Sequence, residues 1–178
     1  MLPGAHDAGR MLAEIVRKGE MPMLGKPEDG WALFQLGSEE TAYDLSYVTD
    51  VAVEWLAQAI HGLTTLDVFS VHGYCEPGRM VCTVSYWCCY VIFEDDDRAP
   101  GCHGVTQLHV SMLDFCRMLH RDISENLDDW VNWNEGDMEA QGDGAEQRRK
   151  AEIREKLDAL ARLIEEKKED FEEDHCFI

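Results

Sequence analysis

Two runs rich in β-branched and aromatic residues, separated by a short turn signal, constrain the fold of this chain most. Leu66 to Tyr74 and Met80 to Phe93 have the composition of β-strands. Between them, Cys75-Glu76-Pro77-Gly78 carries the proline and glycine that are typical of a tight turn. The two runs are therefore predicted to pair as antiparallel strands. The second run exceeds the common strand length, so it is one long bent strand or two short strands broken near Ser85-Tyr86.

Two further segments complete the predicted β-structure. After a charged turn over residues 94–101, Val105 to Val110 alternates in a way that favours another strand. The simplest sheet is an antiparallel β-meander of three to four strands spanning residues 66–110. Trp31 to Leu36 is interpreted as a short strand, with the start of the next helix as the alternative.

Helical periodicity flanks the predicted sheet on both sides. Ser38-Glu39-Glu40-Thr41 supplies N-cap and first-turn residues, and the apolar pattern from Leu45 to Ala59 then predicts a core helix that ends at His61-Gly62. Ser111 is a second N-cap candidate, and the apolar residues after it predict a helix running to about Trp130. The fold class is therefore α+β, with the meander packed against helices near 44–61 and 111–130 and a long C-terminal helix.

A length of 178 residues suits one domain with appendages. The predicted divisions are an N-terminal helix and breaker-rich loop (1–30), an α+β core (31–133), an acidic glycine-containing linker (134–144) and a C-terminal amphipathic helix (145–178). The last helix has a narrow apolar stripe that needs a groove. Internal docking is favoured, with self-association through residues 145–171 as the alternative. The stripe consists of Ile153, Leu157, Leu160, Ile164 and Phe171.

The charge of the chain selects among classes of partner. With 16 basic and 36 acidic residues the formal net charge is -20, and half of this excess lies in residues 94–144. Such a field repels nucleic acid and anionic membranes, so a basic protein partner is expected. The sequence shows neither a secretory signal nor an apolar run of about 20 residues, which predicts a cytoplasmic protein. Seven cysteines without a Cys-x-x-Cys pair predict free thiols.

Two sets of side chains are weak candidates for metal binding. His72 and Cys75, together with Cys102 and His103, flank the hairpin and could supply four zinc ligands, but they lack the paired spacing of structural zinc sites. Glu94-Asp95-Asp96-Asp97 offers four carboxylates without the ligand spacing of an EF-hand loop. We therefore expect no metal and no cofactor, and interpret the acidic run as a solvated turn or a surface that receives Arg or Lys.

Signatures of catalysis are absent from the sequence. The chain contains no Gly-x-Ser-x-Gly, P-loop, dinucleotide-binding glycine pattern or His-Glu-x-x-His. Cys116 and His120 lie one helical turn apart, but Cys116 falls on the apolar face of its helix, where a thiol acts as a small hydrophobe. The chain is therefore not expected to be an enzyme.

A tryptophan-containing acidic segment is the strongest candidate for partner binding. Trp130 and Trp133 lie among carboxylates, a composition that suits either an interface anchor with a polar rim or a lid on the core. Together with the acidic run it gives the predicted partner-binding residues, which are Glu94, Asp95, Asp96, Asp97, Asp128, Asp129, Trp130, Trp133, Glu135 and Asp137.

The order of three features resembles small bacterial immunity proteins of polymorphic toxin systems. These features are Asp44-Leu45-Ser46-Tyr47-Val48-Thr49-Asp50 entering a core helix, the turn at Glu76-Pro77-Gly78, and a helix ending near Trp130. The resemblance covers residues 44–133. It implies a cytosolic antitoxin that occludes the basic active site of its toxin with acidic residues.

Two other classes are alternatives to an immunity protein. A phage-encoded inhibitor of a host defence nuclease that mimics DNA would need rows of carboxylates at phosphate spacing, whereas residues 145–178 are nearly charge-balanced. A metal-dependent enzyme would need a convergent set of ligands that the sequence does not supply.

Overall fold

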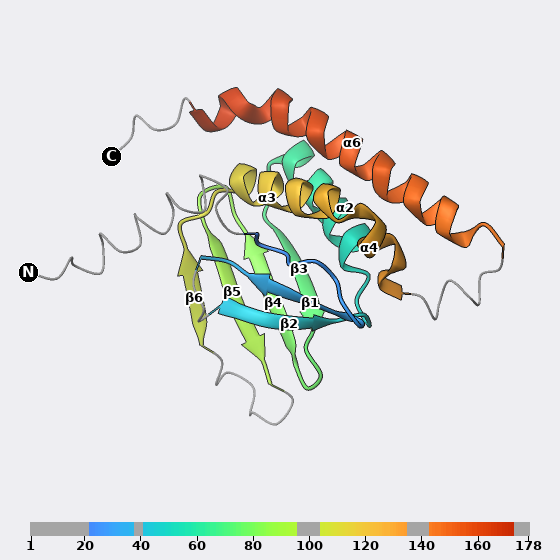
Figure 1. The fold of residues 1–178 in the computed structure, drawn as a ribbon. Helices are drawn as coiled ribbons and strands as arrows, with labels where there is room; N and C mark the ends of the chain where they lie inside the picture. The colour runs from blue at the N-terminus through green and yellow to red at the C-terminus, as the bar shows by residue number, and fades with distance from the viewer. Residues whose placement is uncertain (1–21, 38–40, 96–103, 135–142, 173–178) are drawn as a thin grey trace, which may run out of the picture.

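The computed structural model describes residues 22–37, 41–95, 104–134 and 143–172, and Figure 1 shows their arrangement. The predicted helix near the N-terminus and most of the predicted linker lie outside these ranges. Along the described chain the elements are β1 (Trp31–Gln35), β2 (Ala42–Ser46), α2 (Val51–Thr65), β3 (Phe69–Tyr74), β4 (Arg79–Val84), β5 (Cys89–Glu94), β6 (Val105–Leu108), α3 (Met112–Glu125), α4 (Leu127–Val131), the 3-10 turn η2 (Asn132–Asn134) and α6 (Ala145–Glu172).

The predicted meander is confirmed as a four-stranded antiparallel sheet in the order β3-β4-β5-β6. Alternate residues of each strand face inward, so that Val71, Cys82 and Val91 lie side by side on the buried face. The run from Met80 to Phe93 forms two short strands. They are separated by a turn in which the Ser85 N–H donates to the Cys88 carbonyl at 2.9 Å.

A second, two-stranded antiparallel sheet lies over the inner face of the first. The strand predicted from Trp31 is confirmed as β1, which pairs with β2 on one edge. On its other edge β1 is joined by the preceding chain, where the Gly25 N–H donates to the Leu33 carbonyl at 2.7 Å. The inner face of β1–β2 packs on the larger sheet through the stacked rings of Tyr43 and Phe93, whose centroids lie 5.4 Å apart.

The prediction that residues 38–41 begin the core helix is wrong. Residues 42–46 form β2, and α2 starts at Val51 after Asp50, whose carboxylate accepts the Val53 N–H at 3.3 Å as the N-cap. Leu45 and Val48 share the helical spacing of the later apolar residues, but the pairing of β2 with β1 determines the local structure. Residues 38–40 themselves lie outside the described ranges.

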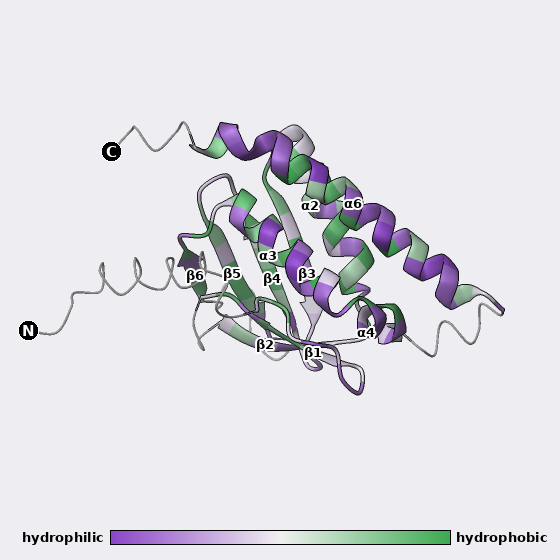
Figure 2. Cartoon of the chain, turned by 45° about the horizontal axis from the view of Figure 1, so that its top comes forward, coloured by the Kyte–Doolittle hydropathy of each residue, from purple (hydrophilic) through white to green (hydrophobic). Residues whose placement is uncertain are grey.

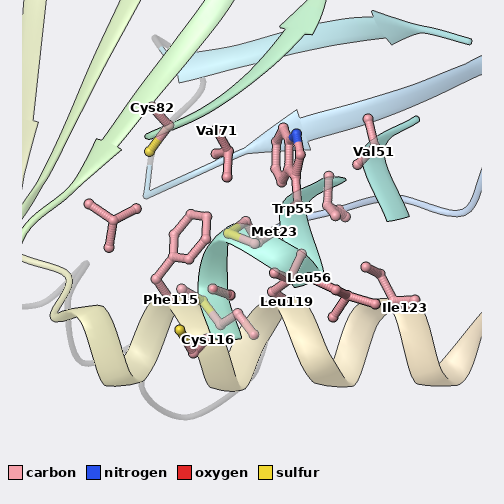
Figure 3. Close-up of a cluster of buried hydrophobic side chains, with 14 of the residues drawn as sticks. Met23, Val51, Trp55, Leu56, Val71, Cys82, Phe115, Cys116, Leu119 and Ile123 are labelled. Atoms are coloured by element: carbon pink, nitrogen blue, oxygen red, sulfur yellow. The ribbon is translucent and has the colours of Figure 1, made fainter. Parts of the chain in front are cut away.

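Helices α2 and α3 cover the inner face of the larger sheet beside β1 and β2, as Figure 1 shows. Figure 3 shows the resulting core, in which Trp55 from α2 and Phe115 from α3 lie between the helices and the sheet. Phe115 makes an edge-to-face contact with Phe69 of β3 at 5.9 Å between centroids. The helix predicted to run to Trp130 is interrupted at Asn126, whose side-chain amide donates to the Asp122 carbonyl at 3.1 Å.

The long C-terminal helix is confirmed as α6, which crosses α2, α3 and α4 on the side away from the sheet. Its predicted apolar stripe is buried in the same chain, so the groove it needs is supplied internally. Figure 2 shows the hydrophilic residues of α6 interspersed with this stripe. Near its end, Phe171 stacks on Tyr86 with ring centroids 4.1 Å apart, and the Tyr86 hydroxyl donates to the Asp170 carbonyl at 2.7 Å. None of the described helices has the length and apolarity needed to span a membrane.

Candidate protein-binding surface

Glu94 and Asp95, two of the predicted partner-binding residues, lie at the end of β5. Glu94 is directly opposite Arg79 of β4 and forms an ion pair with it, so this carboxylate is partly neutralised on the sheet. Asp95 follows and is half-buried. Asp96 and Asp97 lie outside the described residues. This end of the sheet therefore presents an ion pair followed by the half-buried Asp95.

Asp128 and Asp129, also predicted to bind a partner, lie in α4 and form ion pairs with lysines of other segments. Asp128 is exposed and forms an ion pair with Lys150 of α6, which lowers the pKa of the Asp128 carboxyl. The Asp129 carboxylate lies 3.3 Å from the Lys26 ammonium group. Both pairs are largely solvated, so each contributes little to stability. Glu135 and Asp137 lie outside the described residues.

The two tryptophans of the predicted anchor are buried in the core. Trp130 is 0% and Trp133 4% exposed, with ring centroids 5.1 Å apart. The Trp133 indole N–H donates to the Thr49 carbonyl at 2.8 Å. Of the two roles predicted for these residues, the structure places them in the core, because α4 and η2 fold the segment against the start of α2. In this conformation neither indole is available to a partner.

A guanidinium group that the sequence interpretation did not single out holds this region together. Arg149 of α6 binds both carboxylate oxygens of Asp50, at 2.5 and 2.8 Å. Its Nε also donates to the Val131 carbonyl at 3.0 Å. One side chain therefore joins the N-terminus of α2, the C-terminus of α4 and the first turns of α6. The periodic pattern of α6 predicted the role of its apolar residues and gave no signal for Arg149.

A buried carboxylate was also missed. Asp122 of α3 accepts the backbone N–H groups of Met23 and Leu24 at 2.7 and 2.9 Å, and Arg121 at 2.7 Å. Burial raises the pKa of Asp122, and the same hydrogen bonds oppose this rise. In the sequence, the signal for this residue was an aspartate next to Ile123 on the apolar face of a predicted helix. Asp122 fixes the segment that precedes β1.

The candidate zinc ligands do not assemble into a described site. His72 lies on the outer face of β3, and its backbone carbonyl accepts the Trp55 indole N–H at 2.8 Å. Cys75 is half-buried at the start of the β3–β4 turn, where burial raises its pKa. Cys102 and His103 lie outside the described residues. Within the ranges that the structure describes, no three His, Cys, Asp or Glu side chains are grouped to hold a metal.

The Cys116 and His120 pair has the electrostatics of core residues. Cys116 is fully buried, and this burial raises its pKa well above the ordinary value. Burial also lowers the pKa of the half-buried His120, with a smaller opposing effect from Asp158. A thiolate and an imidazolium are therefore both disfavoured at this position.

Four exposed hydrophobic side chains on β1 and in the turn after β2 form what we call the aromatic patch. Each is between 39 and 55% exposed. Two lie on the outer face of β1 and two in the turn after β2, the strand that pairs with β1. Tyr74 is also exposed, but it lies on the outer face of β3, where its ring contacts His72. The aromatic patch consists of Trp31, Leu33, Tyr47 and Val48.

A backbone hydrogen bond joins the two segments of the aromatic patch. The Tyr47 N–H donates to the Gly30 carbonyl at 2.9 Å. Gly30 has φ +80°, and a Cβ there would lie 3.1 Å from the Tyr47 ring. Glycine therefore permits both the turn and the close approach of the ring.

Carboxylates surround the aromatic patch. Glu28 and Asp29 precede Gly30, and exposed Asp44 is directly opposite Leu33 across the β1–β2 pair. Glu76 accepts a hydrogen bond from the Ser46 hydroxyl. The sequence did contain a signal for this surface. In β1, Trp31 and Leu33 alternate with Ala32 and Phe34, so a strand buried on one face must expose apolar side chains on the other.

Comparisons with protein-family models, with curated proteins and with solved structures found no match to this chain.

Proposed function

We propose that this chain is a protein-binding module that docks on a basic partner and covers its active site, as an immunity protein does with its toxin. The formal charge of -20 carries the proposal. A field of this sign accelerates encounters with a positively charged protein and disfavours encounters with nucleic acid. The proposed action takes place in the cytoplasm and requires neither a catalytic residue nor a cofactor.

The distribution of side chains supports a protein interface. Specific interfaces combine exposed aromatic residues with a polar rim, and the aromatic patch with its carboxylates has this composition. The solvent side of α6 carries both signs of charge, with Arg154, Arg162 and Lys168 among its acidic residues. Because a DNA mimic needs uninterrupted carboxylate rows, this mixture favours an immunity-type inhibitor over a DNA mimic.

The test is co-expression of the chain with each protein encoded by the genes adjacent to its own. We expect one of these proteins to arrest growth when expressed alone, to be neutralised by the chain and to co-purify with it. Recovery of nucleic acid in place of a protein, with no neighbouring product neutralised, would overturn the proposal.

Salt dependence provides a kinetic test on the purified pair. The Debye length falls from about 10 Å at 0.1 M salt to about 3 Å at 1 M, so association should slow markedly across this range while dissociation changes much less. Surface plasmon resonance measures both rates. An association rate that is independent of salt would contradict electrostatic steering.

Charge reversal tests the three aspartates that follow β5 in the sequence. Replacing Asp95, Asp96 and Asp97 with lysine should lower the association rate by about tenfold or more and leave dissociation less affected. The control variant replaces Glu165, Glu166 and Glu169 with lysine, which changes the net charge equally on the exposed side of α6. Equal rates for the two variants would show that net charge alone, and no local contact of Asp95, Asp96 or Asp97, guides association.

A further inference from the structure

The eight exposed large hydrophobic side chains within the described ranges are unevenly distributed. Four belong to the aromatic patch, and the other four are Val68, Tyr74, Trp87 and Val105 on other segments. Trp87 is engaged within the chain, since its ring makes edge contacts with Tyr86 and Phe171. The aromatic patch is therefore the described surface where exposed apolar side chains are concentrated.

We infer that the aromatic patch is the anchor of the interface, and that its occupant is a basic protein presenting an apolar depression bordered by Arg and Lys. This inference rests on the proposed function and assigns it a surface. Tryptophan and tyrosine are over-represented among residues that dominate binding energy, and two of the four patch residues are of these types. Trp130 and Trp133, which the sequence suggested for this role, are buried.

The charge around the aromatic patch specifies the chemistry of the occupant. Glu28, Asp29 and Asp44 are exposed beside it. Lys26, on the segment that joins the edge of β1, is already paired with Asp129. Arg and Lys at the border of the partner's depression would find carboxylate acceptors at this rim. A second copy of this chain would instead place two acidic rims against each other, which is unfavourable.

The aromatic patch is organised before a partner arrives. The bond from Tyr47 to Gly30 joins the backbone of its two segments, and the Tyr47 ring rests on Gly30. Preorganised side chains lose less conformational freedom on binding. The structure therefore presents an anchoring surface that requires no rearrangement of the β1–β2 sheet.

A matched pair of exposed valines tests the inference. Val48 in the aromatic patch is 55% exposed, and Val68 before β3 is 61% exposed. The probe is the neighbouring-gene product that the chain neutralises, titrated by surface plasmon resonance. Val48→Lys should weaken binding by about tenfold or more, through faster dissociation as well as charge repulsion, while Val68→Lys should bind as the unmodified chain does. Circular dichroism verifies that both variants keep the fold.

A second variant tests the aromatic contribution. Trp31→Ala should weaken binding by about 30-fold if the indole is a central anchor. Equal affinities for Val48→Lys, Val68→Lys and the unmodified chain would overturn the inference while leaving the proposed function intact. Failure of the unmodified chain to bind any neighbouring product would overturn the proposed function itself. A dimer in sedimentation velocity that Val48→Lys dissociates would identify a second copy as the occupant, and would also overturn the inference.

Discussion

Replacing Arg149 with methionine keeps the aliphatic stem of this side chain and removes the guanidinium that joins α6 to Asp50. The side chains of Arg149 and Asp50 are only 14 and 25% exposed, so the remaining carboxylate would be poorly solvated. The carbonyl of Val131 would lose its donor as well. Removing one partner of a fully buried pair costs about 3–5 kcal/mol, and partial access of water to Asp50 reduces the expected loss to about 2–3 kcal/mol.

Urea unfolding monitored by tryptophan fluorescence measures this loss. With a urea dependence of about 2 kcal/mol per molar, the midpoint should fall by roughly 1 M or more. Arg162→Met makes the same chemical change on the exposed side of α6 and should change stability by less than about 0.5 kcal/mol. An Asp50→Asn variant preserves the N-cap of α2 and completes a double-mutant cycle with Arg149→Met. If Arg149→Met and Arg162→Met shift the midpoint equally, the structural role assigned to Arg149 is refuted.

Three further predictions concern the core. Burial lowers the pKa of His120 below 6.5, and Asp158 opposes this effect, so the unfolded state binds more protons just below that pH. The free energy of unfolding should therefore fall as pH drops through 6.5. In urea titrations at a series of pH values, His120→Gln should reduce this dependence. Gly62→Ala would place a Cβ 2.1 Å from the Phe69 ring, so it should destabilise the protein by about 1 kcal/mol or more, although alanine has the better helix propensity. The control Gly104→Ala would place its Cβ in open space and should leave stability unchanged in the same assay. A thiol-reactive chromophore should detect seven free thiols after unfolding, and in the native protein it should leave unreacted the buried Cys82, Cys89 and Cys116.

Periodicity predicted the parts of this fold in which one face of an element is buried. For the sheet, alternation in Val105 to Val110 added a strand to the two runs that composition and a turn signal had predicted, and the stripe of α6 identified a helix whose apolar side is covered. Periodicity could not identify β2, because Leu45 extends the helical pattern of α2 backwards, and a five-residue strand is decided by its pairing with β1.

The candidate surface was harder to predict for a different reason. A segment with tryptophans flanked by carboxylates has the same composition whether its indole rings face solvent or the core. Trp130 and Trp133 face the core because α4 and the turn after it pack near Thr49. The aromatic patch joins Trp31 and Leu33 of β1 with Tyr47 and Val48, which follow β2. Only the tertiary structure brings such segments together, although the two apolar faces of β1 indicated that one of them is exposed.

The carboxylate of Asp122 has a consequence for the order in which this molecule can be completed during synthesis. It accepts hydrogen bonds from the N–H groups of Met23 and Leu24, which are 99 and 98 residues away in the sequence. The segment of these two residues lies along one edge of β1. A ribosome delivers β1 and β2 long before it delivers α3, and contacts between such distant residues form late. The support beneath Trp31 and Leu33 is therefore incomplete until α3 has emerged. A nascent chain would acquire its finished aromatic surface only after α3 has emerged, so a partner that recognises this surface would select chains that have passed this point over shorter ones.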